Sequence, residues 1–311
     1  MKLCNIEINC GEKKQVLLPV TDKKSICATL ICGKNKGKTL VVTAGVHGCE
    51  YIGVEAVRNI AQKLQPNDIS GQAIFVPVVN TEGFYTGAKQ IVPSDGVNLN
   101  RAFPGDENKT DAFQIAQAIE RLLYHNADFL IDLHSGDINE MATSFVYFPI
   151  AVLPEVMEKA KKGAKAISMP YRVASTAKNG LYSWAAQKGI PSLLLEKGGM
   201  GVWSEKEVLE YENNIFELMH YLNMTPYKTM EQKQQKEITQ TMYFESEEDG
   251  FWYPNIKAGQ KVKKGALLGE LKDMQYNLLQ RYEAPYDSIV LYYTLSLGVK
   301  KNDSLIALGR L

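Results

Sequence analysis

The chain has 311 residues, 45% hydrophobic and 23% charged, which is an ordinary composition for a soluble globular protein with a sizeable core. Thirty-five basic residues balance thirty-five acidic ones, so no overall field attracts nucleic acid or an anionic membrane, and neither is expected as a partner. No run reaches the ~20 apolar residues of a membrane span, and the first residues lack the apolar run of a signal peptide. Five cysteines, all within the first fifty residues and without a CxxC pair, favour a reducing compartment. We therefore expect a cytoplasmic protein.

Predicted strands and helices alternate through most of the chain. After two leading strands within residues 1–32, the β-branched run 38–46 leads through a short loop into a segment with helical spacing, 51–65. Further strands are predicted at 71–79, 127–133 and 191–195, and further helices at 111–125, 154–166 and 205–222. This alternation predicts an α/β fold with a mixed, mostly parallel sheet and helices on both faces.

The last seventy residues have a different character. Polar residues dominate from 225 to 240, and from Thr241 onward short apolar strands alternate with glycine turns. We therefore predict two domains: an α/β domain at 1–228, joined by a linker at 229–240 to a small all-β domain at 241–311.

Three polar residues, His47, His134 and Glu196, each follow a predicted strand directly. In open sheets of this class, ligands bind beyond the carboxyl ends of the strands. Residues far apart in the sequence are therefore expected to converge at one edge of the sheet.

His47 and Glu50 are three residues apart in a loop between a strand and a helix, so both can face one point. Catalytic zinc is commonly held by three protein ligands of these types, and His134 supplies the third. The alternative is that His47 and Glu50 only cap the helix start, which leaves His134 unexplained. Asp132 is predicted to orient His134 through its second ring nitrogen, with a buried ion pair or a strand-end cap as the alternative.

Two further groups are suited to catalysis and substrate binding. Glu196 beside a metal could serve as general base and then general acid, whereas the alternative is a solvated turn glutamate. Asn100 and Arg101 combine an amide with a planar guanidinium, which suits a substrate carboxylate, although they also fit an ordinary surface loop.

Four motifs in order, GVHGCE, NLNRAFPG, IDLHSG and LLLEKGG, resemble the succinylglutamate desuccinylase/aspartoacylase family, which has a zinc carboxypeptidase-like fold. The resemblance implies one Zn2+ per chain and a catalytic Glu196. It also implies a carboxylate-binding pair, and it matches Asp132 to the aspartate of the family's D-L-H motif. The implied zinc ligands are His47, Glu50 and His134, and the implied pair is Asn100 and Arg101.

The sequence departs from the family pattern in two places. Family members carry an additional arginine shortly before the N-R motif, but the segment Gly87–Pro93 has none. Lys89 is predicted to bind substrate in its stead, with Arg172 as the alternative. In addition, Lys197 follows Glu196, and an ammonium close to that carboxylate would lower its pKa.

The last domain resembles a barrel-sandwich hybrid, the architecture of biotinyl and lipoyl carriers. Lys272 lacks the sequence context of a modified carrier lysine. Two other roles stay open: closing the entrance of the active site, or forming the interface of a homo-oligomer. Candidates to line the entrance, or alternatively to pack in a core, are Tyr243, Phe251, Trp252 and Tyr253.

The leading hypothesis is therefore a zinc-dependent hydrolase that cleaves the amide bond of an N-acyl amino acid or a related small N-acyl compound. A zinc carboxypeptidase that acts on peptides is the second hypothesis. The third is a catalytically silent binding or carrier protein of the same fold. The partner expected on the leading hypothesis is a small N-acylated molecule.

Overall fold

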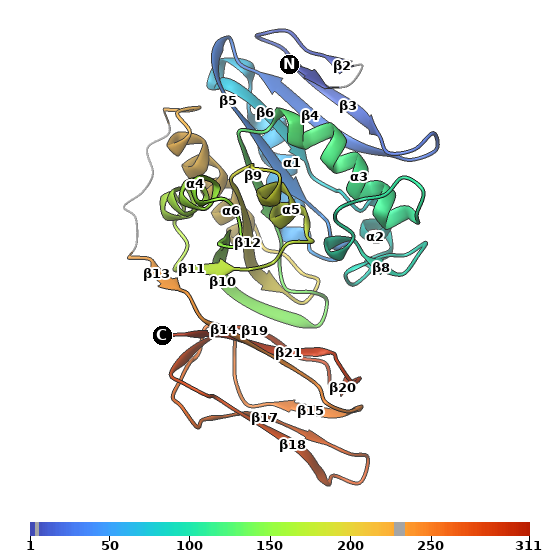
Figure 1. Cartoon of the computed structure of the whole chain (residues 1–311), viewed down its shortest axis with the longest axis vertical. Coiled ribbons are helices and arrows are strands. Elements are labelled where there is room, and N and C mark those ends of the chain that lie inside the picture. The colour runs from blue at the N-terminus through green and yellow to red at the C-terminus, as the bar shows by residue number, and fades with distance from the viewer. Residues whose placement is uncertain (4–5, 227–233) are drawn as a thin grey trace.

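The computed structural model describes residues 1–3, 6–226 and 234–311. Figure 1 shows an α/β part that contains the N-terminus and, below it, a part built from strands alone that contains the C-terminus. Over the described residues, no helix is both long and apolar enough to cross a membrane. Among the cysteines, Cys32 and Cys49 are buried and Cys10 is exposed, whereas Cys4 lies outside the described residues.

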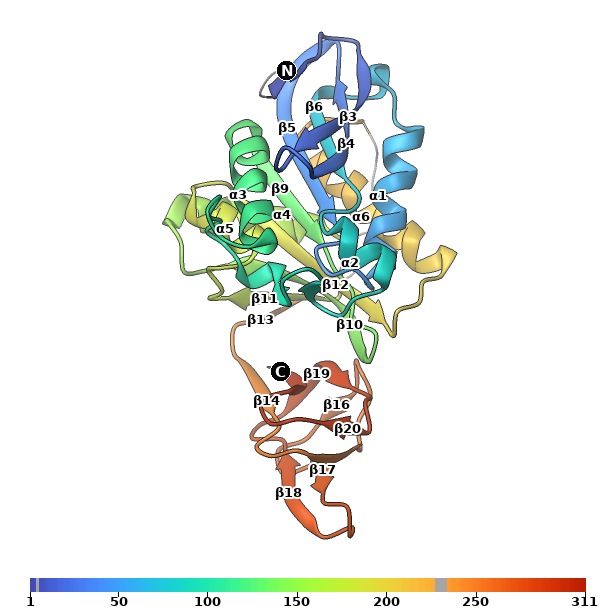
Figure 2. The ribbon, with the colours of Figure 1, turned by 90° about the vertical axis from the view of Figure 1, so that its right-hand side faces the viewer.

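One large sheet runs through both parts of the molecule (Figures 1 and 2). It contains 13 strands within the described residues. Its path is β14 (Thr241–Glu245), β21 (Ser304–Arg310), β19 (Ser288–Thr294), β10 (Glu140–Pro149), β12 (Ser192–Gly199), β9 (Phe129–Leu133), β5 (Asn35–Ala44), β6 (Ser70–Val76), β4 (Ser25–Cys32) and β3 (Lys13–Pro19). Three short strands attach beside this path: β11 (Tyr171–Ser175), β13 (Lys236–Ile238) and β16 (Lys261–Val262).

The expectation of a mostly parallel sheet is not confirmed, because parallel pairing is confined to parts of the sheet. Strands β6, β5, β9 and β12 form a parallel centre, and β10, β11 and β13 are parallel to one another. The β3–β4 hairpin, the β4–β6 pair and the β10–β12 pair are antiparallel, as are the pairs among the C-terminal strands. The parallel centre arises where helices connect successive strands, and direct reversals of the chain make the flanks antiparallel.

Helices cover both faces of the sheet, as predicted. One hydrophobic core lies under α1 (Tyr51–Lys63), α4 (Pro154–Ala166) and α6 (Glu205–Tyr221), and a second lies under α3 (Asp111–Leu123) and α5 (Leu181–Gln187). The remaining elements are short: α2 (Thr81–Thr86), the 3-10 turns η1 (Pro66–Asp68), η2 (Leu99–Arg101) and η3 (Tyr124–Asn126), and the paired strands β1 (Lys2–Leu3) with β2 (Ile6–Glu7) and β7 (Ile91–Val92) with β8 (Val97–Asn98). The cores account for the apolar spacing of the predicted helices.

The C-terminal strands form two layers. A second sheet has the order β18 (Leu278–Glu283), β17 (Leu267–Lys272), β15 (Gly250–Pro254) and β20 (Gly298–Val299), and Trp252 is buried in the core of this part. The barrel-sandwich architecture itself is not confirmed. Strand β19 pairs with β10 through Glu140–Ala142, so these strands extend the catalytic sheet.

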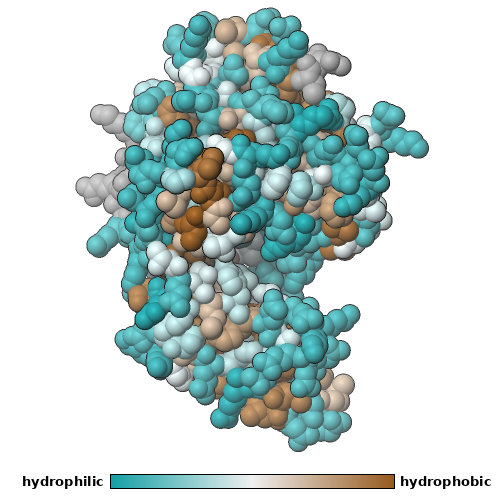
Figure 3. Space-filling view, in the orientation of Figure 1, coloured by the Kyte–Doolittle hydropathy of each residue, from teal (hydrophilic) through white to brown (hydrophobic). Residues whose placement is uncertain are grey.

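The segment predicted as a linker contains ordered structure. Strand β13 pairs in parallel with β11 of the α/β part, at residues that fall inside the predicted linker 229–240. Residues 229–233 of that linker lie outside the described residues. The face drawn in Figure 3 is mostly hydrophilic, with apolar side chains gathered in small patches.

Candidate active site

The loop that carries His47 leaves β5 and enters α1, with Glu50 directly before the helix. Gly48 lets this loop lie against the backbone of α2, because a Cβ atom there would come within 2.0 Å of the Gly83 carbonyl. His134 follows β9, which is parallel to β5 and next to it in the sheet. The predicted convergence at the carboxyl ends of these two strands is therefore confirmed for His47, Glu50 and His134.

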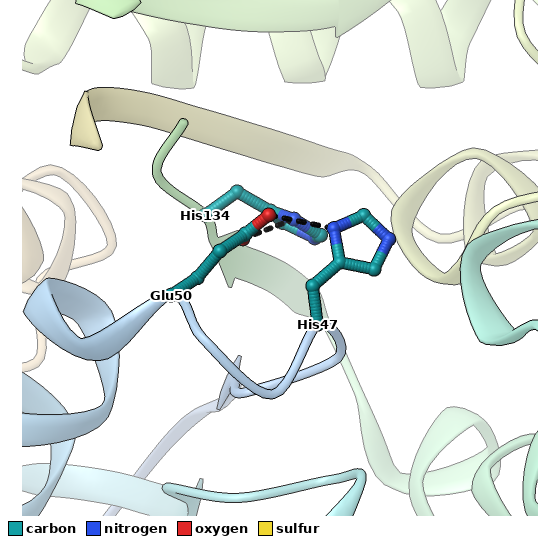
Figure 4. A group of neighbouring side chains, drawn as sticks. All are labelled: His47, Glu50 and His134. Atoms are coloured by element: carbon teal, nitrogen blue, oxygen red, sulfur yellow. Dashed lines mark hydrogen bonds and ion pairs between the residues drawn. The ribbon is translucent and has the colours of Figure 1, made fainter. Parts of the chain in front are cut away.

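The three side chains point toward one another, and all three are buried (Figure 4). The Glu50 carboxylate lies between the imidazoles: Oε1 is 2.6 Å from His47 Nδ1, and Oε2 is 2.8 Å from His134 Nδ1. One candidate ligand atom from each residue lies within 4.8 Å of the others. A single ion could therefore be reached by all three.

The charges in this group stabilise one another. Burial alone would raise the pKa of Glu50, but the two neighbouring imidazoles outweigh burial and lower that pKa to about 2. Burial would likewise lower the pKa of His134, but Glu50 and Asp132 raise it well above its usual value. Glu50 is thus an anion between two imidazoles, and a cation could displace the protons of this group.

The second nitrogen of each imidazole also has a partner. His134 Nε2 is 3.0 Å from Asp132 Oδ2, and Asp132 Oδ1 accepts a 2.6 Å hydrogen bond from the Thr43 hydroxyl. His47 Nε2 is 3.3 Å from Asn98 Oδ1. Because Asp132 and Asn98 each accept an N–H from Nε2, Nδ1 is the nitrogen of each imidazole that faces Glu50, and a cation bound there would take the place of the Nδ1 protons.

Asp132 therefore occupies the orienting position predicted for it, buried against His134. The matching role of Asn98 was missed in the sequence. Its signal was present, because Asn98 begins the motif that contains Asn100 and Arg101, but only the long-range fold brings it to His47.

The donor set fits a metal ion. Once their Nδ1 protons are displaced, two imidazoles and one carboxylate match the ligands of catalytic zinc sites, where three protein ligands leave a position for water. Metal-ligating histidines almost always donate a hydrogen bond from the ring nitrogen that does not bind the metal. His134 and His47 each have an acceptor for such a bond at Nε2. His47, Glu50 and His134 are accordingly a group that can hold a metal.

A cavity of about 760 Å³ opens beside this group. Side chains from the α/β part and from the C-terminal strands line it together. Among its lining residues are Glu196, Asn100, Arg101, Gln90, Asn98, Asp137, Glu140, Tyr147, Tyr182, Leu194, Tyr243, Glu245, Tyr292 and Ser304. His47, Glu50 and His134, here called the metal-type group, therefore line the same cavity as the predicted catalytic carboxylate of Glu196. The predicted carboxylate-binding residues Asn100 and Arg101 line it too.

Glu196 lies within β12, which continues to Gly199, so the prediction that the strand ends before this residue is wrong. Burial raises the pKa of Glu196 well above its usual value, and the carboxylates of Glu50 and Glu140 add to the increase. A carboxyl group whose pKa is raised in this way is suited to take a proton and return it.

Lys197 does not act on Glu196 as expected. Successive side chains of a strand point to opposite faces, and the Lys197 ammonium lies 2.5 Å from Glu210 Oε2 and over the ring of Tyr211, in helix α6. The prediction that this ammonium lowers the pKa of Glu196 is therefore wrong.

Asn100 and Arg101 lie in the η2 turn and both line the cavity. Asn100 is buried, and its Oδ1 accepts a 2.9 Å hydrogen bond from the Leu181 amide, whereas its Nδ2 has no partner among the residues that the structure describes. Arg101 is exposed to the cavity, and its Nη1 donates to the Asn100 carbonyl at 2.8 Å. This arrangement presents a guanidinium and an amide side by side.

Neither residue suggested in place of the absent arginine lines the cavity. Lys89 Nζ donates to Asn139 Oδ1 at 2.7 Å and lies 3.4 Å from Glu140 Oε1. Arg172 is engaged by Glu237, with its Nε 2.9 Å from that carboxylate, in the β11–β13 region. The residue of the segment 87–93 that does line the cavity is Gln90, which the sequence did not single out.

The C-terminal strands form one wall of the cavity. Tyr243 lies there, as proposed from sequence, and its hydroxyl is 3.0 Å from that of Tyr147 in β10. Tyr292 contributes from β19. Trp252 instead packs in the C-terminal core, and Phe251 and Tyr253 are not among the lining residues.

Comparison with known proteins agrees with this geometry. The model of the succinylglutamate desuccinylase/aspartoacylase catalytic domain matches residues 36–222, well over half of the chain. The chain belongs to this family. The matched region contains all the predicted site residues, from His47 to Glu196.

Several known proteins are similar to this chain over most of its length. An N-alpha-acetyl-L-2,4-diaminobutyric acid deacetylase of Halomonas elongata is 28% identical over 307 residues, covering 94% of this chain and 86% of the relative. The product-bound structure of the ectoine utilization protein EutE (DoeB) from Ruegeria pomeroyi has a TM-score of 0.88 at 24% identity, covering 99% of this chain and 98% of the other. A succinylglutamate desuccinylase/aspartoacylase structure from Rhodobacter sphaeroides has a TM-score of 0.87 at 22% identity, covering the same shares.

Proposed function

We propose that this protein is a zinc-dependent hydrolase that cleaves the amide bond of an N-acyl amino acid. The observation that carries the proposal is the shared cavity: the group of His47, Glu50 and His134 opens onto it together with Glu196 and Arg101. Membership of a family of deacylating enzymes supports the same reaction class.

The metal is proposed to be zinc because of the ligand chemistry. Two imidazoles and one carboxylate with an open position are typical of hydrolytic zinc enzymes. When bound, the ion would supply Lewis-acid activation of water and of the scissile carbonyl.

The residues of the chain then divide the remaining work. Glu196 accepts a proton from the attacking water and returns it to the nitrogen of the leaving amine, which its raised pKa favours. Arg101 and the free amide end of Asn100 hold the substrate carboxylate, so that the acyl carbonyl lies within reach of the metal group.

The charges of the cavity favour a substrate with a second ammonium group. Asp137, Glu140 and Glu245 line it in addition to Glu50 and Glu196, whereas within the described residues Arg101 is the one lysine or arginine among the lining side chains. A cationic side chain on the substrate would offset part of this negative charge. We therefore propose an N-acetylated diamino acid, the chemistry named for the Halomonas relative.

The test is hydrolysis of a panel of N-acyl amino acids by protein stripped of metal and then reloaded with zinc. We expect release of the free amino acid only after reloading, and fastest with N-acetyl-2,4-diaminobutyrate. The panel should include the isosteric neutral analogue N-acetylnorvaline and the anionic N-acetylaspartate. Full activity without metal would refute the zinc dependence, and no hydrolysis of any member would refute the reaction class.

A carboxypeptidase that acts on peptides is the second candidate, and its fold and metal group would be the same. The wall formed by the C-terminal strands favours the small substrate, because a peptide needs an open groove. C-terminally free peptides in the same panel separate the two activities. The cytoplasmic location and the homo-oligomer stay predictions.

Asp132→Asn is expected to weaken zinc binding by ~10–100-fold, because the neutral amide accepts more weakly from His134 and no longer fixes its tautomer. The zinc dissociation constant, measured by competition with a coloured chelator, checks this. Asp128→Asn, the same change at the exposed residue directly before β9, is the control and should leave the constant unchanged. Equal zinc affinity of Asp132→Asn and wild type would contradict the orienting role.

Arg101→Gln is expected to lower kcat/KM by ~10–100-fold, since a hydrogen bond to a charged group contributes ~1.5–3 kcal/mol and each 1.4 kcal/mol is tenfold. Most of the change should lie in KM, because the carboxylate is bound equally in the ground state and the transition state. Steady-state kinetics with the best substrate of the panel measure it. Arg58→Gln on the exposed face of α1 is the matched control, and an unchanged KM in Arg101→Gln would count against this assignment.

A further inference from the structure

Gln90 has an unusual backbone conformation at the edge of the cavity. Its φ of 59° lies in the left-handed region, which residues other than glycine adopt rarely and at a cost in free energy. Both neighbours are held in place: Lys89 donates to Asn139 Oδ1 at 2.7 Å, and the Ile91 carbonyl accepts from Asn80 Nδ2 at 3.0 Å. The surrounding contacts therefore hold Gln90 in a conformation that its own preferences oppose.

The orientation of the Gln90 amide follows from a chain of hydrogen bonds that begins at a backbone N–H. The Asn100 N–H can only donate, and it lies 2.8 Å from Asn98 Oδ1, which identifies the oxygen end of the Asn98 side chain. Asn98 Nδ2 must then point the other way, where it donates to Gln90 Oε1 at 3.4 Å. The oxygen of Gln90 is thereby engaged, so its NH2 group is the end directed elsewhere.

Asn98 links Gln90 to His47, one of the three residues of the metal-type group. Asn98 Oδ1, in the same amide that contacts Gln90, is 3.3 Å from His47 Nε2, so a single side chain separates Gln90 from a candidate metal ligand. Gln90 lines the cavity that the substrate would occupy. Within residues 1–3, 6–226 and 234–311, its Nε2 has no hydrogen-bond partner, so two donors remain available to a ligand.

We propose that the Gln90 side-chain amide donates a hydrogen bond to the oxygen of the scissile acyl group and binds it most strongly as negative charge develops there. This inference rests on the proposed amide hydrolysis. As water adds to the carbonyl carbon, the C=O π electrons move onto the oxygen, and a fixed N–H donor stabilises that charge without reorganisation. The one cation of this segment, Lys89, is turned to Asn139 and Glu140, so a neutral amide serves in this place.

The test uses the full chain loaded with zinc and the variant Gln90→Met, which keeps the length of the side chain and removes both donors. Loss of one such donor lowers kcat by ~10²–10³-fold in comparable sites, and that is the result expected here, with KM little changed. A phosphonamidate analogue of the substrate, which mimics the tetrahedral state, should bind more weakly by the same factor in calorimetry. Binding of the product amino acid should not change.

Gln90→Glu is the second variant, because it retains the shape and replaces the donor by an acceptor. Zinc content and melting temperature measured on each variant separate a loss of folding from a loss of catalysis. Gln62→Met, on the exposed face of α1, is the matched control. These comparisons assign any loss of kcat to the amide donor itself.

Two results would overturn the inference while the proposed function stands: an active wild type with an equally active Gln90→Met, or a variant that raises KM and leaves kcat and phosphonamidate binding intact. If the wild type hydrolyses no member of the panel, the proposed function fails, and this inference fails with it. The wild-type measurement therefore tells the two failures apart.

Discussion

Glu196→Gln is expected to lower kcat by ~10²–10⁴-fold, the range that a positioned general base contributes. The glutamine side chain has nearly the same size and keeps a hydrogen-bonding group, so the cavity retains its shape. It cannot accept a proton from water or return one to the leaving amine. The zinc content of the variant should equal that of wild type, because Glu196 is not among the residues of the metal-type group.

The pH dependence of the wild type gives an independent check on Glu196. The base must be ionised, so activity falls as the pH drops through its pKa. Burial, and then the nearby carboxylates of Glu50 and Glu140, raise that pKa, so the acidic limb should lie above the usual range of a glutamate. The residual activity of Glu196→Gln should lack this limb. Glu158→Gln on the exposed face of α4 is the control, and a fully active Glu196→Gln would exclude the assigned role.

His134→Ala is expected to abolish both metal binding and activity. The change removes one of three ligands and leaves the buried Glu50 carboxylate and Asp132 without the imidazole that lies between them. Breaking a buried charged pair costs ~3–5 kcal/mol, so the melting temperature should also fall. Metal analysis of the purified protein measures the first effect directly.

The comparison with chelated wild type makes this result specific. Wild type stripped of metal should regain activity when zinc is added, whereas His134→Ala should not regain it at any zinc concentration that keeps the protein in solution. His125→Ala, the same change at an exposed position in η3, should behave as wild type. A His134→Ala protein that retains one equivalent of zinc would disprove the proposed ligand set.

The sequence was most informative where one local pattern determines position. The apolar runs before His47 and His134 predicted strand ends, and the ends of neighbouring parallel strands must meet at one edge of the sheet. Asp132 was predictable in the same way, because it lies on the strand that leads into His134. These parts of the site depend on short stretches of chain and on one rule of topology.

Other predictions failed because they depended on the direction in which a side chain points or on contacts with residues far along the chain. The alternation of side chains along β12 sends Glu196 and Lys197 to opposite faces, and the strand was predicted too short for this to be seen. The orientation of Lys89 depends on Asn139, which lies fifty residues further along the chain. Gln90 carries no motif of its own, and its importance appears only from its backbone conformation and its contact with Asn98.

The pairing of β19 with β10, and the cavity wall that Tyr292 and Ser304 contribute, have a consequence for how the enzyme is made. Proteins are synthesised from the N-terminus, and domains generally fold as units as they emerge. His47, Glu50 and His134 leave the ribosome long before the residues that close the cavity. A nascent chain can therefore hold a folded α/β part before the wall of its cavity exists, so the proposed selectivity for small substrates requires synthesis of the C-terminal strands.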